Sequence, residues 1–537
     1  MEVMQHMFNI VLETGIYPYD WKVGLNIPIY KNGCTFNPEN YRGITLINTT
    51  GKLFCQILNQ RISDYLEHNN CLVKEQAGFR KKFRTTDHIF LLNKLVDSVL
   101  KTRTKRLYCC FVDFQKAFDN VWHQALLVKL NNIGITGKIF NIVKNMYLNA
   151  TVYTKIKGRY MDEITVKRGV HQGNTLSPTL FNVYINDIVR YIDEKDSPFI
   201  TATERIPCLL YADDLALLST TKLGLQTKLD KLQKYCSDWG LKINKTKTKV
   251  IVFTNSLPKI PIHFKCGDHI IETVKTYKYL GVVFHQKGKF QATQEHLAKQ
   301  STKAAYAIRK AIHGQSLKPD IIMRLFDSLI TPILTYGAEV WFPFSFNGHT
   351  VFHIDDLFKS CLSGLFAYEN LHLKFCKQIL GVHKKAMVLP TLGELGRFPL
   401  TIKIISQIIS FWIHVTESKP NSYTRLLYDY LYKNDEHDRW INTIKNILCT
   451  IGFKHVWKNQ STLDVDRLTY AVQRKLEDLY KTFWVYKKQE STKLRFYDFV
   501  TKEYRLEPYL INCKNKNYKK TFCKFRTSCH DLMIEKG

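Results

Sequence analysis

Three aspartates have the residue type and the neighbours that a metal site for phosphate chemistry requires. Asp113 directly follows the apolar run Leu107–Val112, so a strand would end in its carboxylate. Asp213 and Asp214 lie between two apolar runs, and this pattern predicts a β-hairpin with both carboxylates at its turn. Carboxylate oxygens suit Mg²⁺, and two such ions about 3.5–4 Å apart can activate a hydroxyl and stabilise a departing phosphate. If the strand and the hairpin share one sheet face, the three carboxylates converge there.

A sheet flanked by helices must position these aspartates. Strand and helix patterns alternate from Leu107 onward, and a helix is expected to start immediately after Asp113. After about residue 287, helical patterns with aromatic and basic residues dominate. The expected elements are helices over 51–67, 125–130 and 402–415, a hairpin over 206–218, and strands over 107–112, 250–253 and 279–284.

The composition indicates a folded protein with a polyanionic partner. The chain has 537 residues, of which 45% are hydrophobic, enough for several cores. Lys and Arg total 78 against 47 Asp and Glu, a formal net charge of +31 that attracts nucleic acid without distinguishing RNA from DNA. The fourteen cysteines form no disulfide framework and no signal peptide opens the chain, so we expect an intracellular protein with reduced thiols. The most apolar stretch, 402–415, is too short to cross a bilayer, and no membrane partner is expected.

Taken singly, each aspartate motif has an ordinary structural explanation. Asp-Asp between apolar runs is commonly just a hairpin turn, and Asp after a strand commonly caps a helix. Between the two motifs, however, Arg168–Asn182 contains a turn that Gly173 permits and a helix that can begin at Ser177-Pro178. The three motifs, in this order and spacing, resemble the palm of reverse transcriptases, and most closely the polymerases of non-LTR (LINE-type) retrotransposons.

The resemblance covers most of residues 18–400. Segments 336–341, 375–382 and 393–397 are similar to LINE-type enzymes and would be absent from retroviral ones. The resemblance implies an α+β right-hand polymerase fold with fingers, palm and thumb, followed by a mostly helical C-terminal extension. The domains expected are fingers and an N-terminal extension over 1–105, the palm with remaining fingers elements over 106–287, a helical thumb over 288–370, and a helical basic C-terminal region over 371–537.

The resemblance also assigns roles to individual residues. Asp113, Asp213 and Asp214 are expected to bind two Mg²⁺ ions, with Mn²⁺ as a substitute, and Lys247 to protonate the departing pyrophosphate. The expected nucleotide-binding residues are Lys31, Arg42, Phe118 and Gln172. The expected template and primer contacts are Arg80, Gly173, Tyr279, Leu280 and Gly281, and the segment 279–282 resembles the family's primer-gripping hairpin.

Several of these residues have alternative, purely structural explanations. For Lys31 and Arg42 the alternative is that they are solvated surface cations, and an aromatic at the position of Phe118 is commonly core. In the implied role, the ring of Phe118 collides with a ribose 2′-hydroxyl. Lys245 and Lys249 lie close enough to Lys247 to compete for its role.

The implied function is RNA-directed DNA synthesis on template RNA from a DNA primer with dNTPs. The alternative is a non-catalytic RNA-binding remnant of such an element. By resemblance, a ribonucleoprotein in the nucleus and cytoplasm is expected. Cys513, Cys523, Cys529 and His530 lack the short paired spacings of a zinc site, so we expect no zinc. Because the likeness begins at Pro18, without room for the endonuclease domain of many relatives, we expect a fragment or a truncated copy.

Overall fold

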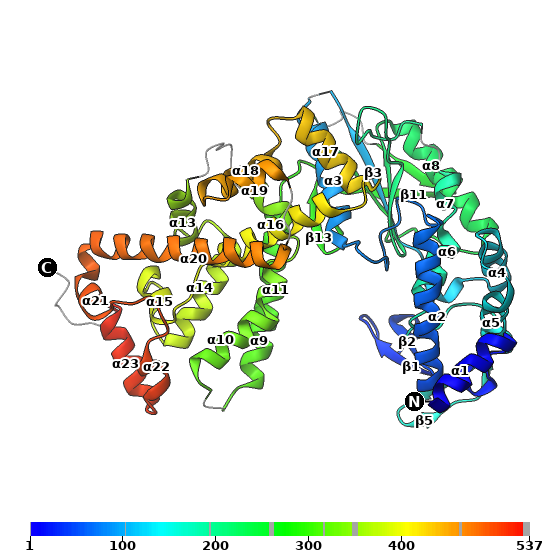
Figure 1. Cartoon of the computed structure of the whole chain (residues 1–537), viewed down its shortest axis with the longest axis horizontal. Coiled ribbons are helices and arrows are strands. Elements are labelled where there is room, and N and C mark those ends of the chain that lie inside the picture. The colour runs from blue at the N-terminus through cyan, green and yellow to red at the C-terminus, as the bar shows by residue number, and fades with distance from the viewer. Residues whose placement is uncertain are drawn as a thin grey trace. The chain divides into compact units, whose positions relative to one another are not determined.

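The structure is a computed structural model that describes residues 2–102, 104–192, 195–256, 262–314, 317–345, 353–460 and 464–529 (Figure 1). His530, considered above, lies outside these residues. The chain forms two compact units that divide between Tyr277 and Lys278. Mixed sheets characterise the first unit, and helices almost fill the second, so the expected α+β class with a helical C-terminal region is confirmed. The finer division into four domains stays a prediction.

The first unit combines two sheets with eight α-helices in its described residues. The helices are α1 (Glu2–Thr14), α2 (Thr49–His68), α3 (Thr85–Leu100), α4 (His123–Asn132), α5 (Gly137–Tyr147), α6 (Ser177–Ile185), α7 (Ile188–Tyr191) and α8 (Lys222–Asp238). The strands are β1 (Val23–Tyr30), β2 (Tyr41–Leu46), β3 (Leu107–Val112), β4 (Thr151–Ile156), β5 (Arg159–Tyr160), β6 (Ile164–Thr165), β7 (Cys208–Tyr211), β8 (Asp214–Ser219), β9 (Lys249–Phe253), β10 (Phe264–Cys266) and β11 (His269–Thr273). Short 3₁₀ turns are η1 (Tyr19–Trp21), η2 (Pro38–Asn40) and η3 (Ala117–Asn120).

The larger sheet has the strand order β10-β11-β9-β3-β8-β7, with β3 antiparallel to both β9 and β8. All six residues of β3 are buried. Because successive side chains of a strand point to opposite faces, such a strand must be covered on both. The helices α3 and α8 both pack against β3 and contribute to that cover.

The smaller sheet is built around β1, which pairs antiparallel with β2 and parallel with β4. The amphipathic helix α2 follows β2, and the side chain of Asn48 caps it by accepting the N–H groups of Thr50 and Gly51 at 2.9 and 3.2 Å. Its buried residues recur at helical spacing, as the sequence predicted: Phe54, Leu58, Ile62 and Leu66.

The second unit is helical after a short hairpin. The strand β12 (Thr276–Tyr279) enters it and pairs with β13 (Val282–His285). The helices are α9 (Gln291–Ala311), α10 (Pro319–Leu329), α11 (Thr331–Leu334), α12 (Ala338–Trp341), α13 (Ile354–Leu362), α14 (Ala367–Leu380), α15 (Val388–Glu394), α16 (Leu400–Glu417), α17 (Tyr423–Asn434), α18 (Arg439–Thr450), α19 (Lys454–Asn459), α20 (Val465–Glu490), α21 (Arg495–Val500), α22 (Pro508–Asn512) and α23 (Lys516–Arg526), with 3₁₀ turns η4 (Phe342–Ser345) and η5 (Thr492–Leu494).

The core of the second unit lies around α16, which packs against α20 and α12 and is mostly buried, as predicted for 402–415. The last described helix, α23, is fixed to α15 by a buried ion pair between Arg526 and Glu394 at 2.9 Å. Within the described residues no single helix is both long and apolar enough to span a bilayer, and one bent pair, 319–334 with 338–345, reaches that length and composition.

Two sequence predictions about elements were wrong. No helix starts directly after Asp113, because Gln115 donates its N–H to the carbonyl of Lys242 at 2.8 Å and keeps the chain extended. Lys116 then has a left-handed φ of 43°, and only the turn η3 precedes α4. The run 279–284 is not one strand but the hairpin β12-β13, whose turn residues Leu280 and Gly281 have φ values of 44° and 86°. The hairpin that the resemblance implied over 279–282 is therefore present.

Candidate active site

The central sheet places the three aspartates on neighbouring strands. In the register of β3 and β8, Val112 lies opposite Leu215, so Asp113 follows one strand where Asp214 begins the other. Asp213 and Ala212 form the two-residue turn between β7 and β8, because Tyr211 pairs with Asp214. The structure therefore brings together the residues predicted to bind metal.

Electrostatics confirm that the carboxylates act on one another. The pKa of Asp213 is raised, mainly by burial and further by the negative charge of Asp113. The positive charges of Arg42 and Lys31 act in the opposite direction and lower this pKa. The pKa of Asp214 is raised to about 6. The main cause is partial burial, and repulsion from the charges of Asp213 and Asp113 adds to it. Asp214 nevertheless has a solvent-exposed surface, so the solvent screens part of this effect.

This donor set fits a divalent cation. The three carboxylates repel one another when ionised, so a bound cation would relieve that repulsion. Carboxylate oxygens are hard ligands of the kind that Mg²⁺ and Mn²⁺ prefer. In the described part of the chain no three His, Cys, Asp or Glu side chains converge tightly enough to enclose an ion by themselves.

Two predicted nucleotide-binding cations face this centre. Lys31 directly follows β1, and Arg42 lies on β2 opposite Ile29. Both side chains are exposed, and both lower the pKa of Asp213 through their charge. The hairpin β1-β2 thus holds positive charge within reach of the carboxylates.

Gln172 lies in a cavity of about 330 Å³ beside the same hairpin, with Tyr41, Lys116, Asp119 and Arg168 also in its wall. Its side-chain nitrogen donates to Oδ1 of Asp119 at 2.7 Å. The sequence does not predict this contact, because a pair 53 residues apart carries no local signal.

Gly173 follows Gln172 in a conformation that favours glycine, with a φ of 122°. A Cβ at this position would lie 2.8 Å from the carbonyl oxygen of Thr45, and Thr45 donates its N–H to the carbonyl of Gln172 at 2.7 Å. The close approach that Gly173 permits is therefore to the backbone of β2.

Phe118 lies in η3 and is partly buried, with its ring stacked on Phe181 at 4.5 Å between centroids. The structure thus gives the ring one packed face. Its contact with a sugar stays a prediction.

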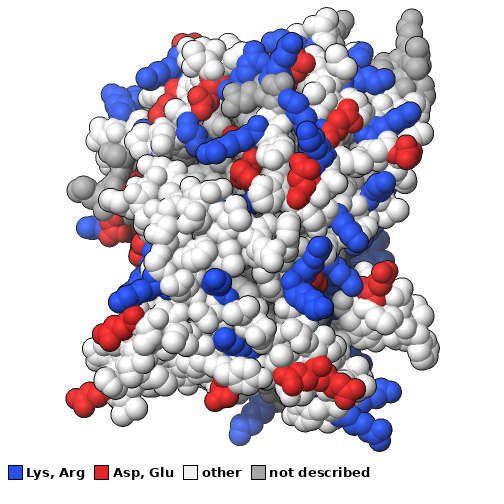
Figure 2. Space-filling model, turned by 90° about the vertical axis from the view of Figure 1, so that its right-hand side faces the viewer, with Lys and Arg blue, Asp and Glu red and all other residues white. Residues whose placement is uncertain are grey.

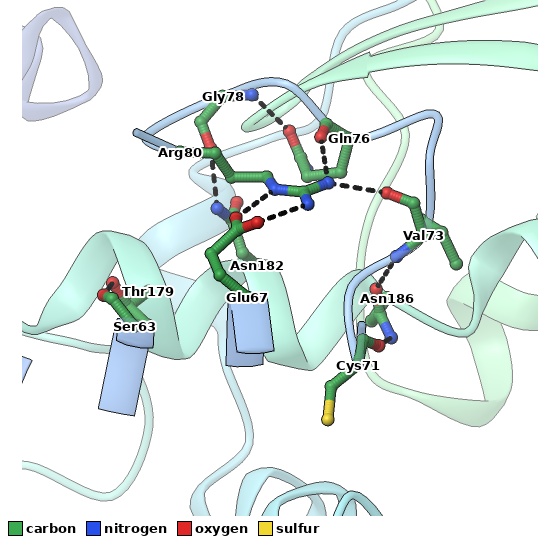
Figure 3. Close-up of polar contacts among 10 residues, drawn as sticks. All are labelled: Ser63, Glu67, Cys71, Val73, Gln76, Gly78, Arg80, Thr179, Asn182 and Asn186. Atoms are coloured by element: carbon green, nitrogen blue, oxygen red, sulfur yellow. Dashed lines mark hydrogen bonds and ion pairs between the residues drawn. The ribbon is translucent and has the colours of Figure 1, made fainter. Parts of the chain in front are cut away.

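The loop 71–84 corrects one expectation (Figure 3). Arg80 was predicted to contact the template, but its guanidinium pairs with Glu67 at 2.6 Å and donates to the carbonyls of Val73 and Gln76, each at 2.9 Å. The side chain of Arg80 is 8% exposed, and its contacts within the protein stabilise the conformation of the loop. Phe79, the neighbouring residue of this loop, is 59% exposed and has a φ of 58°.

Lys247 is exposed next to the segment that contacts Asp113. Asn244 donates its N–H to the carbonyl of Asp113 at 2.7 Å, and its side chain accepts the N–H of Lys247 at 3.3 Å. Of the competing lysines, Lys249 is paired with Glu272 at 2.5 Å, and Lys245 lies near Cys266. The assignment of proton transfer to Lys247 stays a prediction.

The predicted primer contacts lie in the second unit. Leu280 accepts a hydrogen bond from the hydroxyl of Tyr336 at 2.9 Å, and Gly281 packs so closely on that ring that a Cβ would lie 2.6 Å from it. Tyr279 is 3% exposed and therefore supports the hairpin from within.

Sequence reasoning missed Tyr277 on β12. Its ring stacks on Phe111 at 4.4 Å, and burial together with the charges of Asp214 and Asp113 raises its pKa to about 12. No motif marks this position. The alternation of β12 would have been the signal, and the prediction of one strand over 279–284 concealed it.

Charged side chains of both signs lie on the face of the molecule that Figure 2 shows. Figure 2 shows Lys and Arg distributed across one face, with Asp and Glu between them and no single continuous basic patch.

The sequence of the chain is similar to a reverse transcriptase family model and to retrotransposon polymerases. Residues 29–284 match the family model described as reverse transcriptase (RNA-dependent DNA polymerase). The RNA-directed DNA polymerase from mobile element jockey of Drosophila melanogaster is 28% identical over 356 residues, 64% of this chain and 37% of that protein. The Pol polyprotein of the type-1 retrotransposable element R2 of Nasonia vitripennis is 28% identical over 302 residues, 54% of this chain and 29% of that protein.

The chain thus spans little more than a third of the first of these relatives and less of the second. Among solved structures, apo telomerase from Candida tropicalis aligns with a TM-score of 0.38 at 12% identity, over 80% of this chain and 73% of that one.

Proposed function

We propose that residues 29–284 form a reverse transcriptase domain of the non-LTR retrotransposon type and that the chain extends a DNA primer on an RNA template. The observation that carries the proposal is the meeting of Asp113 with Asp213 and Asp214, within range of Arg42 and Lys31. Carboxylates opposite exposed cations suit a substrate that brings both a metal and a triphosphate.

Asp113, Asp213 and Asp214 would hold two divalent ions, which when bound lower the barrier to attack and stabilise the departing pyrophosphate. Arg42 and Lys31 offset negative charge on the triphosphate. Lys247 supplies a proton to the leaving pyrophosphate oxygen. Phe118 excludes a ribose 2′-hydroxyl by contact with C2′ of the sugar.

The partners of the proposal are template RNA, primer DNA and dNTPs. The loop that carries Phe79 offers an exposed aromatic ring on which a template base can stack. In the second unit, His296 on α9 has its pKa lowered by partial burial and by the charges of Lys278, Lys299 and Lys303, which together form a basic cluster suited to phosphates. We further propose that the protein works as an intracellular ribonucleoprotein, in the nucleus and cytoplasm.

Primer extension tests the proposal. The full chain is incubated with an RNA template, a labelled DNA primer, dNTPs and Mg²⁺, and product length is followed with time. Template-encoded extension that stops at a dideoxynucleotide supports the proposal. A protein that binds the RNA with a salt-dependent affinity but extends no primer is the non-catalytic remnant instead.

A further inference from the structure

A strained turn separates β7 from the second metal-binding motif. Ala212, the first residue of that turn, has a φ of 55°, a region that a residue with a Cβ adopts only at a cost in strain. Ala212 is 4% exposed, so its N–H is largely shielded from water. Because Asp213 is the next residue, a contact that holds Ala212 also constrains the backbone that carries the Asp213 carboxylate.

Gln76 makes that contact. Its side-chain oxygen accepts the N–H of Ala212 at 3.0 Å and the N–H of Gly78 at 2.7 Å. Two N–H donors require an acceptor, so the amide must present its oxygen to the turn. The amide nitrogen of Gln76 is buried without a hydrogen-bond partner among the described residues. Burying that donor is unfavourable, which indicates that the side chain is placed for its oxygen.

The loop around Gln76 fixes its backbone (Figure 3). Arg80 donates to the carbonyl of Gln76 at 2.9 Å while Glu67 holds the other edge of its guanidinium. Gln76 is itself 1% exposed. The buried, hydrogen-bonded backbone of Gln76 therefore holds its side-chain oxygen in a fixed position.

The same loop is joined to the palm on both sides of Gln76. Ala77 donates its N–H to the carbonyl of Leu210 on β7 at 2.9 Å, which extends the sheet hydrogen bonding to the loop. Asn182 on α6 donates to the carbonyl of Gly78 at 2.7 Å. A displacement of Gln76 relative to the turn would have to break these contacts as well.

We propose that Gln76 is a positioning residue that keeps the turn in the conformation in which Asp213 and Asp214 face Asp113. The inference rests on the proposed polymerase function, because those carboxylates matter to the rate only if they hold the catalytic metals. Gln76 contacts neither substrate nor metal in this account. It acts through the backbone of Ala212.

The test compares two substitutions in the full chain. Gln76→Met keeps the side-chain volume but removes the acceptor. Asn186→Leu is the matched control, since Asn186 also makes two hydrogen bonds to this loop, with Val73 at 2.9 Å and Cys71 at 2.8 Å, but none to the turn. Amide hydrogen exchange is measured over residues 208–216 without metal or nucleotide.

Exchange over 208–216 should be at least about tenfold faster in Gln76→Met than in the wild type and unchanged in Asn186→Leu. Unchanged exchange in Gln76→Met would overturn the proposal. If Gln76→Met does not fold, Gln76→Asn replaces it, since its shorter side chain stays polar but cannot reach the turn.

The second readout is primer extension. Gln76→Met should lower kcat by about tenfold to a hundredfold and raise the Mg²⁺ concentration for half-maximal rate, with KM for the template unchanged. Wild-type kcat in Gln76→Met would overturn the proposal. If the wild type extends no primer, the proposed function fails, and the exchange experiment still decides whether Gln76 holds the turn.

Discussion

A Cβ on Gly78 would lie 2.2 Å from the backbone nitrogen of Ala212, so the loop and the turn before Asp213 pack backbone against backbone. No side chain of either residue can rotate away to relieve such a contact. The position of the metal-binding turn is thereby coupled to a loop more than a hundred residues earlier in the chain.

Gly78→Ala should therefore push the turn aside, lower stability by about 1–3 kcal/mol and slow primer extension at least about tenfold. Urea unfolding and single-turnover extension measure the two effects. Gly158→Ala is the control: its Cβ would meet nothing within 4 Å, and its positive φ costs about 1–2 kcal/mol without touching the site. Equal loss of activity in both variants would show that only general stability matters.

Phe79 and Arg80 should separate template binding from stability. Phe79→Ala removes an exposed ring and should weaken RNA template binding by about 1–3 kcal/mol with little change in unfolding free energy. Arg80→Ala removes the buried guanidinium that pairs with Glu67 and should cost up to about 3–5 kcal/mol of stability. Fluorescence anisotropy and urea unfolding check the pair. Weaker template binding in a stable Arg80→Ala protein would restore the original assignment of Arg80.

The sequence predicted the carboxylates well because each belongs to a short local pattern. Asp113 follows an apolar run that is indeed the buried strand β3, and Asp213-Asp214 interrupts two runs that are indeed β7 and β8. Patterns of this kind report burial and turn formation, which depend on neighbouring residues. The strand at 107–112 was placed at its observed bounds for that reason.

Contacts between distant segments could not be predicted in the same way. Arg80 has the sequence of a solvated basic turn, and only the fold reveals that Glu67 neutralises it. Gln76 and Ala212 are joined across 136 positions by a single oxygen. The extended path after Asp113 likewise depends on Lys242, whose carbonyl competes successfully with local helix formation.

Phe118→Val should relax sugar selection. A shorter side chain leaves room for a 2′-hydroxyl, so the ratio of kcat/KM for dNTP over rNTP should fall. Some loss of stability is expected too, because the ring stacks on Phe181. Steady-state single-nucleotide insertion measures the ratio. Phe114→Leu, at a 6% exposed core position, should lower stability with the ratio unchanged, and the same behaviour in Phe118→Val would make Phe118 a core residue only.

The raised pKa of Asp214 predicts a pH dependence of stability without metal. Its ordinary value is about 3.9, and the folded value is about 6, so the folded protein binds more protons between these values. This group's contribution to stability is therefore largest below pH 4 and is lost as pH rises to about 6. Solvent screening at this exposed residue reduces the size of the effect but not its sign.

Thermal unfolding of the wild type and Asp214→Asn checks this sign. The advantage of Asp214→Asn in Tm should grow between pH 4 and 6.5 without metal, and added Mg²⁺ should narrow it, because the ion favours the ionised wild-type carboxylates. A difference in Tm that is constant with pH would contradict the coupling of Asp214 to its acidic neighbours.

The most direct test of the account is single-turnover primer extension on an RNA template by the wild type and by Asp213→Ala, with thermal unfolding of both. Asp213→Ala should lose extension while its Tm without metal stays equal to or above the wild-type value, since a repelled carboxylate is removed. Asp113→Ala should behave alike, and Asp214→Ala should retain more activity. Extension by a folded Asp213→Ala protein at the wild-type rate would contradict the claim that these aspartates hold the catalytic metals.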